Sequence, residues 1–252
     1  MRIRKTPVTG VKMDNKDDFT LVQHLTELRI RIVYSLIAVG VTSILAWNFS
    51  ELIFEIVRRP ILPYLPQGGL VFTAPMDKFM AHLKVSVLAG IVMACPIWIF
   101  QLWKFIAPGL YRQERKYGLY FIFFGSVLFL TGISFVYLVV YPAAFSFLLT
   151  FGGEVDRAMI TINDYLSFFM TTTLVFGVAF ELPLVLTIMG IMGVVTKDLL
   201  KNLRRYAMVI ICILSAVLTP PDPMSMVLLV VPLYTLYELS IFLVGVFGTK
   251  PE

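Results

Sequence analysis

Six apolar runs, most of them long enough to cross a lipid bilayer, dominate this 252-residue sequence. A membrane-spanning helix needs roughly 20 consecutive apolar residues, and an ordinary globular domain does not carry such runs. They occupy so much of the chain that 58% of its residues are hydrophobic and its mean hydropathy is +0.85. The sequence therefore predicts an all-α, polytopic membrane protein with six transmembrane helices. These spans are expected at about residues 30–49, 79–103, 117–141, 165–195, 206–218 and 224–247.

The lysines and arginines are distributed unevenly between the two sides of these spans. Sixteen of them fall in the segments on the same side as the amino terminus, and three in the connections on the opposite side. Basic residues accumulate in cytoplasmic segments, so both termini are predicted to be cytoplasmic. The domains then follow as a cytoplasmic segment 1–28, a membrane domain 29–247 and a cytoplasmic tail 248–252. The net charge of +5 is attributed to this orientation, and no nucleic-acid partner is expected.

The fifth run is shorter than a bilayer requires. Its 13 residues, 206–218, make a helix of roughly 20 Å, against a hydrocarbon core of about 30 Å. The proline-rich segment 219–223 stops the helices on both sides of it. We expect this span either to thin the bilayer or to lie behind its neighbours.

The connection between the first two spans, residues 50–77, is the longest and is predicted to be external. Apolar residues at helical spacing in 51–58 predict a short amphipathic helix that Pro60 ends. Such a loop could cap the outer face of the bundle. The alternative is a solvated connector.

The sequence offers little for covalent chemistry or for metal binding. Cys95 and Cys212 lie singly in apolar runs, where a cysteine is usually a small buried hydrophobic residue. The two histidines, His24 and His82, lie near opposite predicted faces. Nucleophile elbows, HExxH, phosphate-binding loops and GxGxxG are all missing from the sequence. We expect no enzyme activity, no catalytic residues, no metal and no cofactor.

Glu181 lies within the fourth apolar run, two residues before Pro183. An ionised carboxylate at a bilayer centre costs about 2.5 to 3.5 kcal/mol or more on insertion scales. Because Pro183 removes a backbone donor and crowds the carbonyl of Ala179, the helix should bend where the acid sits. Glu181 is either a protonated side chain bonded to a neighbouring helix or a polar site exposed to a cavity or groove, and the second reading is favoured.

Three more acids each have a simple structural explanation. Glu27 stands one helical turn before Arg31, which suits an intrahelical ion pair. Glu114 lies between arginines and would balance their charge, while Asp222, among three prolines, would cap the next helix. Outside the amino-terminal tail, acids are scarce in the predicted cytoplasmic connections, so a cationic ligand would have few places to bind.

Five sequence blocks, in order and in register with the six spans, resemble the TatC family, the multispanning component of the twin-arginine protein translocase. They are HLTELR at 24–29, FIAPGLYRQER at 105–115, YLSF at 165–168, FGVAFELP at 176–183 and LTPPD at 218–222. The resemblance implies a glove-shaped bundle in the bacterial cytoplasmic (inner) membrane. It also implies a core receptor for twin-arginine signal peptides in the export of folded proteins, driven by the proton-motive force.

The resemblance also suggests roles for particular residues. The signal-peptide site would comprise Glu27, Phe105 and Glu114, with Arg29 and Arg115 beside it. Glu181 would be the intramembrane polar residue on the concave side, and Pro60 and Asp222 would matter on the external side.

The implied partners are the signal peptides, TatA- and TatB-type single-span membrane proteins, membrane lipid and further copies of the chain. Two positions depart from the family pattern: Met226 where glutamine is frequent, and Gly109 where alanine is common. Met226 puts a polar contact to a single-span partner in doubt. The competing interpretations are a proton-coupled secondary transporter that uses Glu181 and, less favoured, a membrane-embedded enzyme.

Overall fold

The computed structural model describes residues 16–65, 69–107, 118–150, 159–218 and 223–248. Helices account for nearly all of this part of the chain, and no strand occurs in it. Its one β-type pairing is an isolated parallel bridge between Val71 and Thr161. The predicted all-α class is therefore confirmed.

The first span is α1 (Lys16–Trp47), a single helix of 32 residues. The second expected span is the apolar run 79–103. It is built from α3 (Asp77–Met93) and α4 (Cys95–Ile106), which meet at Ala94 with a bend of 54°. Pro96 in the first turn of α4 supplies the reason, because its ring cannot donate to or fit against the preceding helical turn.

The third span continues beyond its predicted end at Tyr141. It comprises α5 (Gly118–Phe135), a π-helical turn η4 (Val136–Val140) and α6 (Tyr141–Thr150). Pro142 would ordinarily break a helix, but the wider π-helical turn directly before it accommodates the missing donor.

The fourth span is interrupted at Glu181, as Pro183 predicts. Helix α7 (Ile162–Ala179) ends before Phe180, and α8 (Leu182–Ile191) begins with Pro183 in its first turn. The amide of Glu181 bonds to the carbonyl of Val178, three residues earlier, at 3.0 Å. The ladder of i to i−4 bonds is thus broken at the acid.

The last part of the chain contains α9 (Lys197–Asn202), α10 (Arg204–Leu218) and α11 (Pro223–Phe247). By length and apolarity four helical segments suffice to cross a membrane, and the bent α3–α4 pair makes a fifth. The 15 residues of α10 give a length of about 22 Å, which agrees with the short fifth span expected from the sequence. The six-span count remains a prediction.

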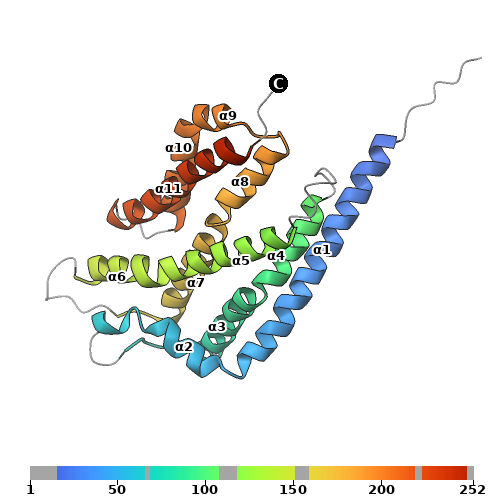
Figure 1. Cartoon of the computed structure of the whole chain (residues 1–252). Helices are drawn as coiled ribbons and strands as arrows, with labels where there is room; N and C mark the ends of the chain where they lie inside the picture. The colour runs from blue at the N-terminus through green and yellow to red at the C-terminus, as the bar shows by residue number, and fades with distance from the viewer. Residues whose placement is uncertain (1–15, 66–68, 108–117, 151–158, 219–222, 249–252) are drawn as a thin grey trace, which may run out of the picture.

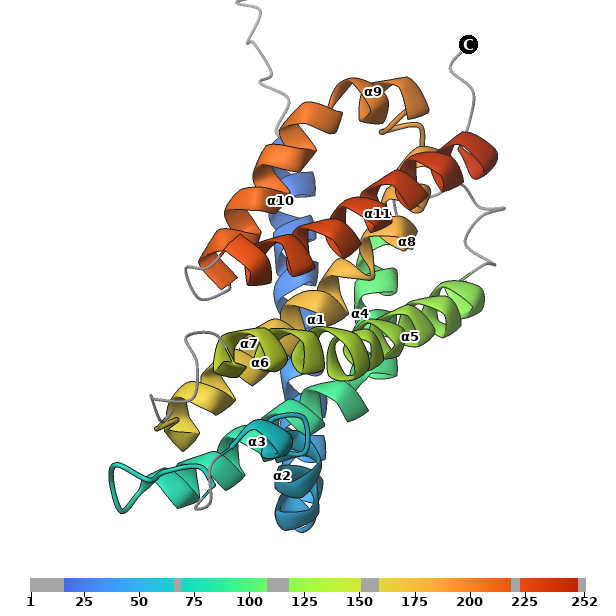
Figure 2. The same cartoon turned by 90° about the vertical axis from the view of Figure 1, so that its left-hand side faces the viewer.

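The helices form an open arrangement rather than a closed bundle (Figures 1 and 2). At one edge α1 packs on α3 and α4, and at the other α11 packs on α8 and α10. The α5–α6 and α7–α8 pairs lie between these edges. This openness is in keeping with the predicted glove shape.

Two ends of the molecule are used below. The outer end holds Trp47, the beginnings of α3 and α7, and the short helices α2 (Ser50–Arg58) and η1 (Leu62–Tyr64). It is the end that the charge distribution predicts to be external. The amino-terminal end holds the first turns of α1, the end of α4 and helix α9.

Candidate functional site

The predicted signal-peptide residues Glu27 and Phe105 lie on neighbouring helices at the amino-terminal end. Helix α1 packs along α4, although the two segments are about 80 residues apart in sequence. The ring of His24, one turn before Glu27, stacks on Phe105 with 4.5 Å between ring centroids and 23° between planes. We call the surface formed by His24, Glu27, Arg31, Gln101 and Phe105 the α1–α4 face.

An ion pair organises this face. The Arg31 guanidinium donates to Oε1 of Glu27 at 2.9 Å, and its other terminal nitrogen donates to Oε1 of Gln101 at 3.4 Å. The intrahelical pair expected from the spacing is therefore present. The side chain of Glu27 remains 34% exposed, and a carboxylate can accept about four hydrogen bonds, so a second cation can share it.

Two basic residues, Lys104 and Arg29, belong to the helices that form the α1–α4 face. Lys104 places its ammonium 4.4 Å from the centroid of the Phe100 ring on the same helix. Arg29 is exposed and lies two residues from Glu27, which turns it about 200° around α1. It therefore lies on the opposite side of the helix from Glu27. Glu114 and Arg115 fall in 108–117, outside the described residues.

Glu181 is buried, with 7% of its surface exposed, where α7 gives way to α8. Its Oε1 has no hydrogen-bond partner among the described residues. Gly125 of α5 makes room for the carboxylate, since a Cβ there would lie 3.3 Å from Oε2. The side chain is thus enclosed by protein, and this conformation shows neither the groove exposure nor the interhelical hydrogen bond considered from the sequence.

The outer end confirms the predicted amphipathic helix. Helix α2 begins at Ser50, ends at Arg58 and is followed by the turn containing Pro60. Two tyrosine hydroxyls donate hydrogen bonds to backbone carbonyls of α2. Tyr165 donates to the carbonyl of Val57, and Tyr137 donates to the carbonyl of Ile56 at 2.9 Å. The loop therefore packs on the bundle as a cap, and the solvated-connector alternative is wrong for this segment.

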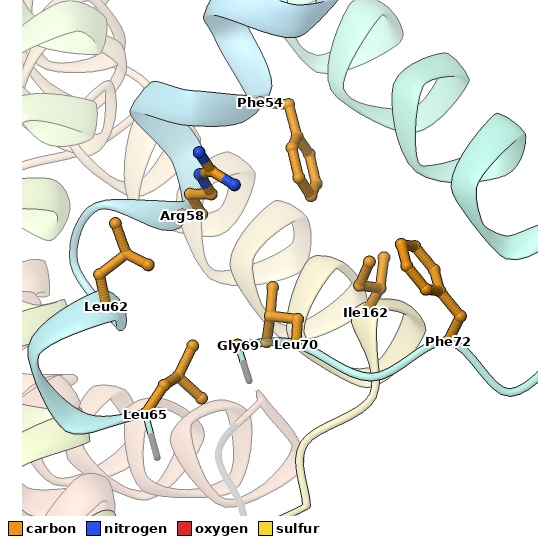
Figure 3. Close-up of a pocket in the computed structure, with 8 residues that line it drawn as sticks. All are labelled: Phe54, Arg58, Leu62, Leu65, Gly69, Leu70, Phe72 and Ile162. Atoms are coloured by element: carbon orange, nitrogen blue, oxygen red, sulfur yellow. The ribbon is translucent and has the colours of Figure 1, made fainter. Parts of the chain in front are cut away.

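A cavity of about 160 Å³ lies inside the cap (Figure 3). Phe54 and Arg58 of α2 face it from one side, and Ile162 at the start of α7 faces it from another. The remaining lining residues come from the loop: Leu62, Leu65, Gly69, Leu70 and Phe72. Pro60 does not line the cavity. Asp222 lies outside the described residues.

A polar joint connects the outer loop to α7. Asp77 accepts from the Thr73 amide and hydroxyl and from the Ala74 amide at 2.7 to 2.9 Å, and from Nδ2 of Asn163 at 2.6 Å. Lys84 donates to Oδ1 of the same Asn163 at 3.1 Å. The backbone amides of Ala74 and Thr73 hold the pKa of Asp77 below its ordinary value of 3.8. The sequence analysis did not predict this joint, whose partners Asp77 and Asn163 are 86 residues apart in sequence.

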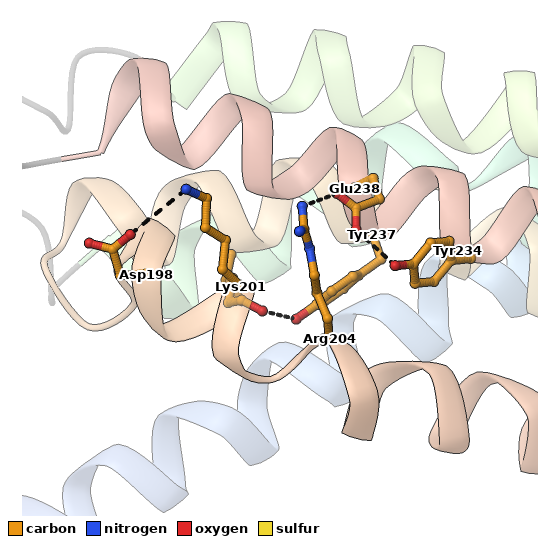
Figure 4. A network of polar contacts seen from close by, with 7 residues as sticks. Asp198, Lys201, Arg204, Tyr234, Tyr237 and Glu238 are labelled. Atoms are coloured by element: carbon orange, nitrogen blue, oxygen red, sulfur yellow. Dashed lines mark hydrogen bonds and ion pairs between the residues drawn. The ribbon is translucent and has the colours of Figure 1, made fainter.

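Glu238 was also missed, although a carboxylate in the apolar run 224–247 was a visible signal. It joins α11 to the start of α10, where Arg204 donates to its Oε2 at 2.6 Å (Figure 4). Tyr234, one turn earlier, donates to Oε1 at 2.9 Å. Tyr237 donates to the carbonyl of Leu200 at 2.7 Å and so holds α9 against the same helix.

Metal ligands are not assembled in the part of the chain that the structure describes. Nowhere in it do three histidine, cysteine, aspartate or glutamate side chains come close enough to share an ion. Cys95 is buried, Cys212 is half-buried, and neither forms a disulfide.

Most of the chain is similar to a single protein family. The family model described as "Sec-independent protein translocase protein (TatC)" matches residues 23–232. The protein of that name from Desulforapulum autotrophicum is 40% identical over 240 residues, which is 95% of this chain and 88% of the relative. The Helicobacter pylori protein (strain 26695) is 40% identical over 92% of this chain and 90% of its own length. A crystal structure described as the twin arginine translocase receptor TatC superposes with a TM-score of 0.80 at 35% identity, covering 88% of this chain and 97% of that one.

Proposed function

Because this chain belongs to the TatC family of Sec-independent protein translocase proteins, we propose that it is the core receptor for twin-arginine signal peptides. The family membership and the apolar helices make it a multi-pass membrane component of a protein translocase. The similar crystal structure is described as a twin-arginine translocase receptor, which supports the same role here.

The observation that carries the proposal is the α1–α4 face. Glu27 presents a half-exposed carboxylate beside the stacked rings of His24 and Phe105. A guanidinium donates two parallel hydrogen bonds to a carboxylate and also stacks on aromatic rings, whereas a lysine ammonium offers only a point charge. This face therefore has the chemistry to prefer an arginine pair over a lysine pair.

The other predicted residues extend the proposed site. Glu114 and Arg115 would complete it from the connection between α4 and α5. Arg29, on the far side of α1, would act on the electrostatic potential rather than by direct contact. The proposal places both termini in the cytoplasm, with six spans and the domain limits 1–28, 29–247 and 248–252. The charge distribution supports this orientation.

The receptor would work as part of a complex in the bacterial cytoplasmic membrane. We expect TatA- and TatB-type single-span proteins and further copies of this chain as partners, with the proton-motive force as the energy source. The chain itself would perform no covalent chemistry and bind no cofactor. Pro60, in the cap, and Asp222, before α11, are proposed to support the external side.

Glu181 is proposed to serve the translocase, as a buried polar group that a partner helix or signal segment reaches when the helices separate. The transporter alternative needs a carboxylate that opens to water on each side in turn. At 7% exposure between α5 and the α7–α8 break, Glu181 gives that alternative no support.

Photocrosslinking tests the receptor role. A photoreactive residue at Phe105, in native membranes, should label a twin-arginine precursor and not its twin-lysine counterpart. The matched control places the probe at Phe123, which is exposed on α5, the next helix along the chain. Equal labelling of both precursors at Phe105, or labelling only from Phe123, would contradict the proposal.

A further inference from the structure

Two connected pockets run along the outer end of α1 and α3, away from the proposed peptide site. The first, of about 440 Å³, has both charged and aromatic lining residues: Trp47, Ser50, Glu51, Pro75, Lys78, Phe79 and His82. The second, of about 310 Å³, is apolar and is lined by Ser43, Ile44, Trp47, Leu83, Ser86 and Val87. Trp47 borders both, so they form one amphipathic groove.

The polar pocket holds opposite charges that do not neutralise each other. Among the described residues neither the Glu51 carboxylate nor the Lys78 ammonium has an ion-pair partner, although both line this pocket. A ligand with an anion and a cation a few ångströms apart would bridge these groups.

An aromatic pair such as the one in this groove is typical of the depth where lipid headgroups meet acyl chains. Trp47 and Phe79 pack edge to face at its middle, with 5.7 Å between ring centroids, as aromatic residues do at a membrane interface. From Lys78 to Val87 the helix rises about 13 Å, close to half of a hydrocarbon core about 30 Å thick. The groove is therefore as deep as one leaflet.

Close packing of α1 and α3 ends the groove toward the bilayer centre. Thr42 donates its hydroxyl to the carbonyl of Gly90 at 2.7 Å, and a Cβ at Gly90 would overlap Ser43. An extended apolar chain thus fits between Trp47 and Ser43 and no further.

We propose that this groove binds one phospholipid of the outer leaflet, with a zwitterionic, primary-amine headgroup. Lys78 faces its phosphate, Glu51 accepts from its ammonium, and one acyl chain lies against Ile44, Leu83 and Val87. A primary ammonium donates hydrogen bonds to a carboxylate, which a quaternary ammonium cannot do. The headgroup pocket itself carries one acid, Glu51, and one lysine, Lys78, which matches a headgroup without net charge. The site is independent of signal-peptide recognition.

Diazirine-labelled lipids test the site on the full-length chain in vesicles. Three lipids with the same photoreactive acyl chain carry ethanolamine, choline or glycerol headgroups, each at the same molar fraction. The ethanolamine lipid should label residues 43–47 and 83–87 about fivefold more than the other two, as one additional ion pair predicts. Mass spectrometry of the digested protein locates the labels.

Variants separate the headgroup contacts from general membrane contact. Glu51→Gln should remove the preference for ethanolamine, and Lys78→Gln should lower labelling by all three lipids. The matched control is Glu55→Gln, on the same helix, whose carboxylate pairs with Arg58 at 3.1 Å and does not line the headgroup pocket. Leu83→Trp, which fills the apolar pocket, should abolish labelling at 43–47.

Either of two results would overturn the proposal. Equal labelling by the three headgroups in the unaltered protein would reduce the groove to ordinary lipid contact. Absence of label from both segments, with the protein folded by its thermal unfolding profile, would mean that another molecule or the protein itself occupies the groove. Signal-peptide crosslinking at Phe105 would be unaffected by either result.

Discussion

The two ends of the molecule are built differently. At the outer end, two backbone hydrogen bonds of 3.0 Å join Val71 to Ile160 and Ile162, and Asp77 accepts four more bonds. At the amino-terminal end, the α1–α4 face rests on one ring stack, one ion pair and one long hydrogen bond of 3.4 Å.

This difference suits two tasks. Backbone bonds and a buried carboxylate fix the outer end in one geometry, because each unsatisfied group would cost free energy on opening. The α1–α4 face has exposed charges and few tertiary bonds, so its side chains can adjust to peptides of different sequence at small cost. In the proposed function, the outer end is the rigid scaffold and the α1–α4 face binds the signal peptide.

The largest effect is expected from removing the centre of the outer joint. Asp77→Ala leaves the amides of Thr73 and Ala74 and the Nδ2 group of Asn163 without their acceptor, so the thermal unfolding midpoint in detergent should fall the most of any change proposed here. Glu55→Ala, at the same end but exposed, is the control and should leave it nearly unchanged. Equal unfolding midpoints for Asp77→Ala and Glu55→Ala would mean that the joint does not stabilise the outer end, and the proposed difference between the two ends would be wrong.

The same joint should weaken in acid. The hydrogen bonds to the ionised carboxyl lower the folded-state pKa of Asp77 below its ordinary value of 3.8, so its contribution is fully present above that pH. It should be lost as the pH falls below about 4 and through the folded-state pKa. Asp77→Asn should remove this part of the pH dependence of unfolding between neutral pH and pH 3.

A smaller effect is expected where the cap rests on α7. Tyr165→Phe removes the hydroxyl that bonds to the buried carbonyl of Val57 and should cost about 1 to 3 kcal/mol in the free energy of unfolding. Tyr34→Phe is the control, because Tyr34 is 54% exposed on α1. A cost as small as the control's would mean that the cap contributes little stability.

On the α1–α4 face the effect should appear in binding rather than in stability. Glu27→Gln should weaken binding of a twin-arginine peptide by about 1 to 2 kcal/mol, roughly 5- to 30-fold, and change twin-lysine binding less. Arg31→Gln, which releases the Glu27 carboxylate from its internal partner, should not weaken it. Fluorescence anisotropy with labelled peptides measures both, and equal losses for the two peptides would contradict the proposed preference.

The smallest effect is expected between α10 and α11. The side chains of Arg204 and Glu238 are 45% and 33% exposed, so a double-mutant cycle with glutamine at each position should give a coupling below about 1 kcal/mol. Lys201 and Asp198, 4.0 Å apart and more exposed, form the control pair and should give less. A coupling above 2 kcal/mol would mean that the α10–α11 contact is a second strongly bonded region, besides the outer end.

The sequence predicted what depends on local composition. Apolar runs coincide with the long apolar helices, helical spacing predicted α2, and Pro183 marked the break at Glu181. No prediction was made for two other prolines: Pro96 lies in the first turn of α4, just after the bend, whereas Pro142 lies shortly after a π-helical turn and the helix continues through it. A proline's effect depends on whether neighbouring helices support the altered backbone, which a single run of sequence does not reveal.

The candidate site was predicted only in part, for a similar reason. The spacing of Glu27 and Arg31 predicts their ion pair, since both lie on one helix. The stack of His24 on Phe105 and the bond from Asn163 to Asp77 join segments more than 80 residues apart. Such contacts arise from the packing of helices, and periodicity in one helix carries no information about its neighbour's register.

The bend at Ala94 gives the second span a mechanical property. Helix α3 is held at the outer end through Asp77 and Lys84, while α4 carries Phe105 at the other end, about 15 Å beyond the bend. A change of about 10° at this elbow would displace the Phe105 ring by about 2.5 Å, with α3 stationary. Helix α3 is thus held in place at the outer end, and the bend angle at Ala94 sets where Phe105 lies on the proposed receptor surface.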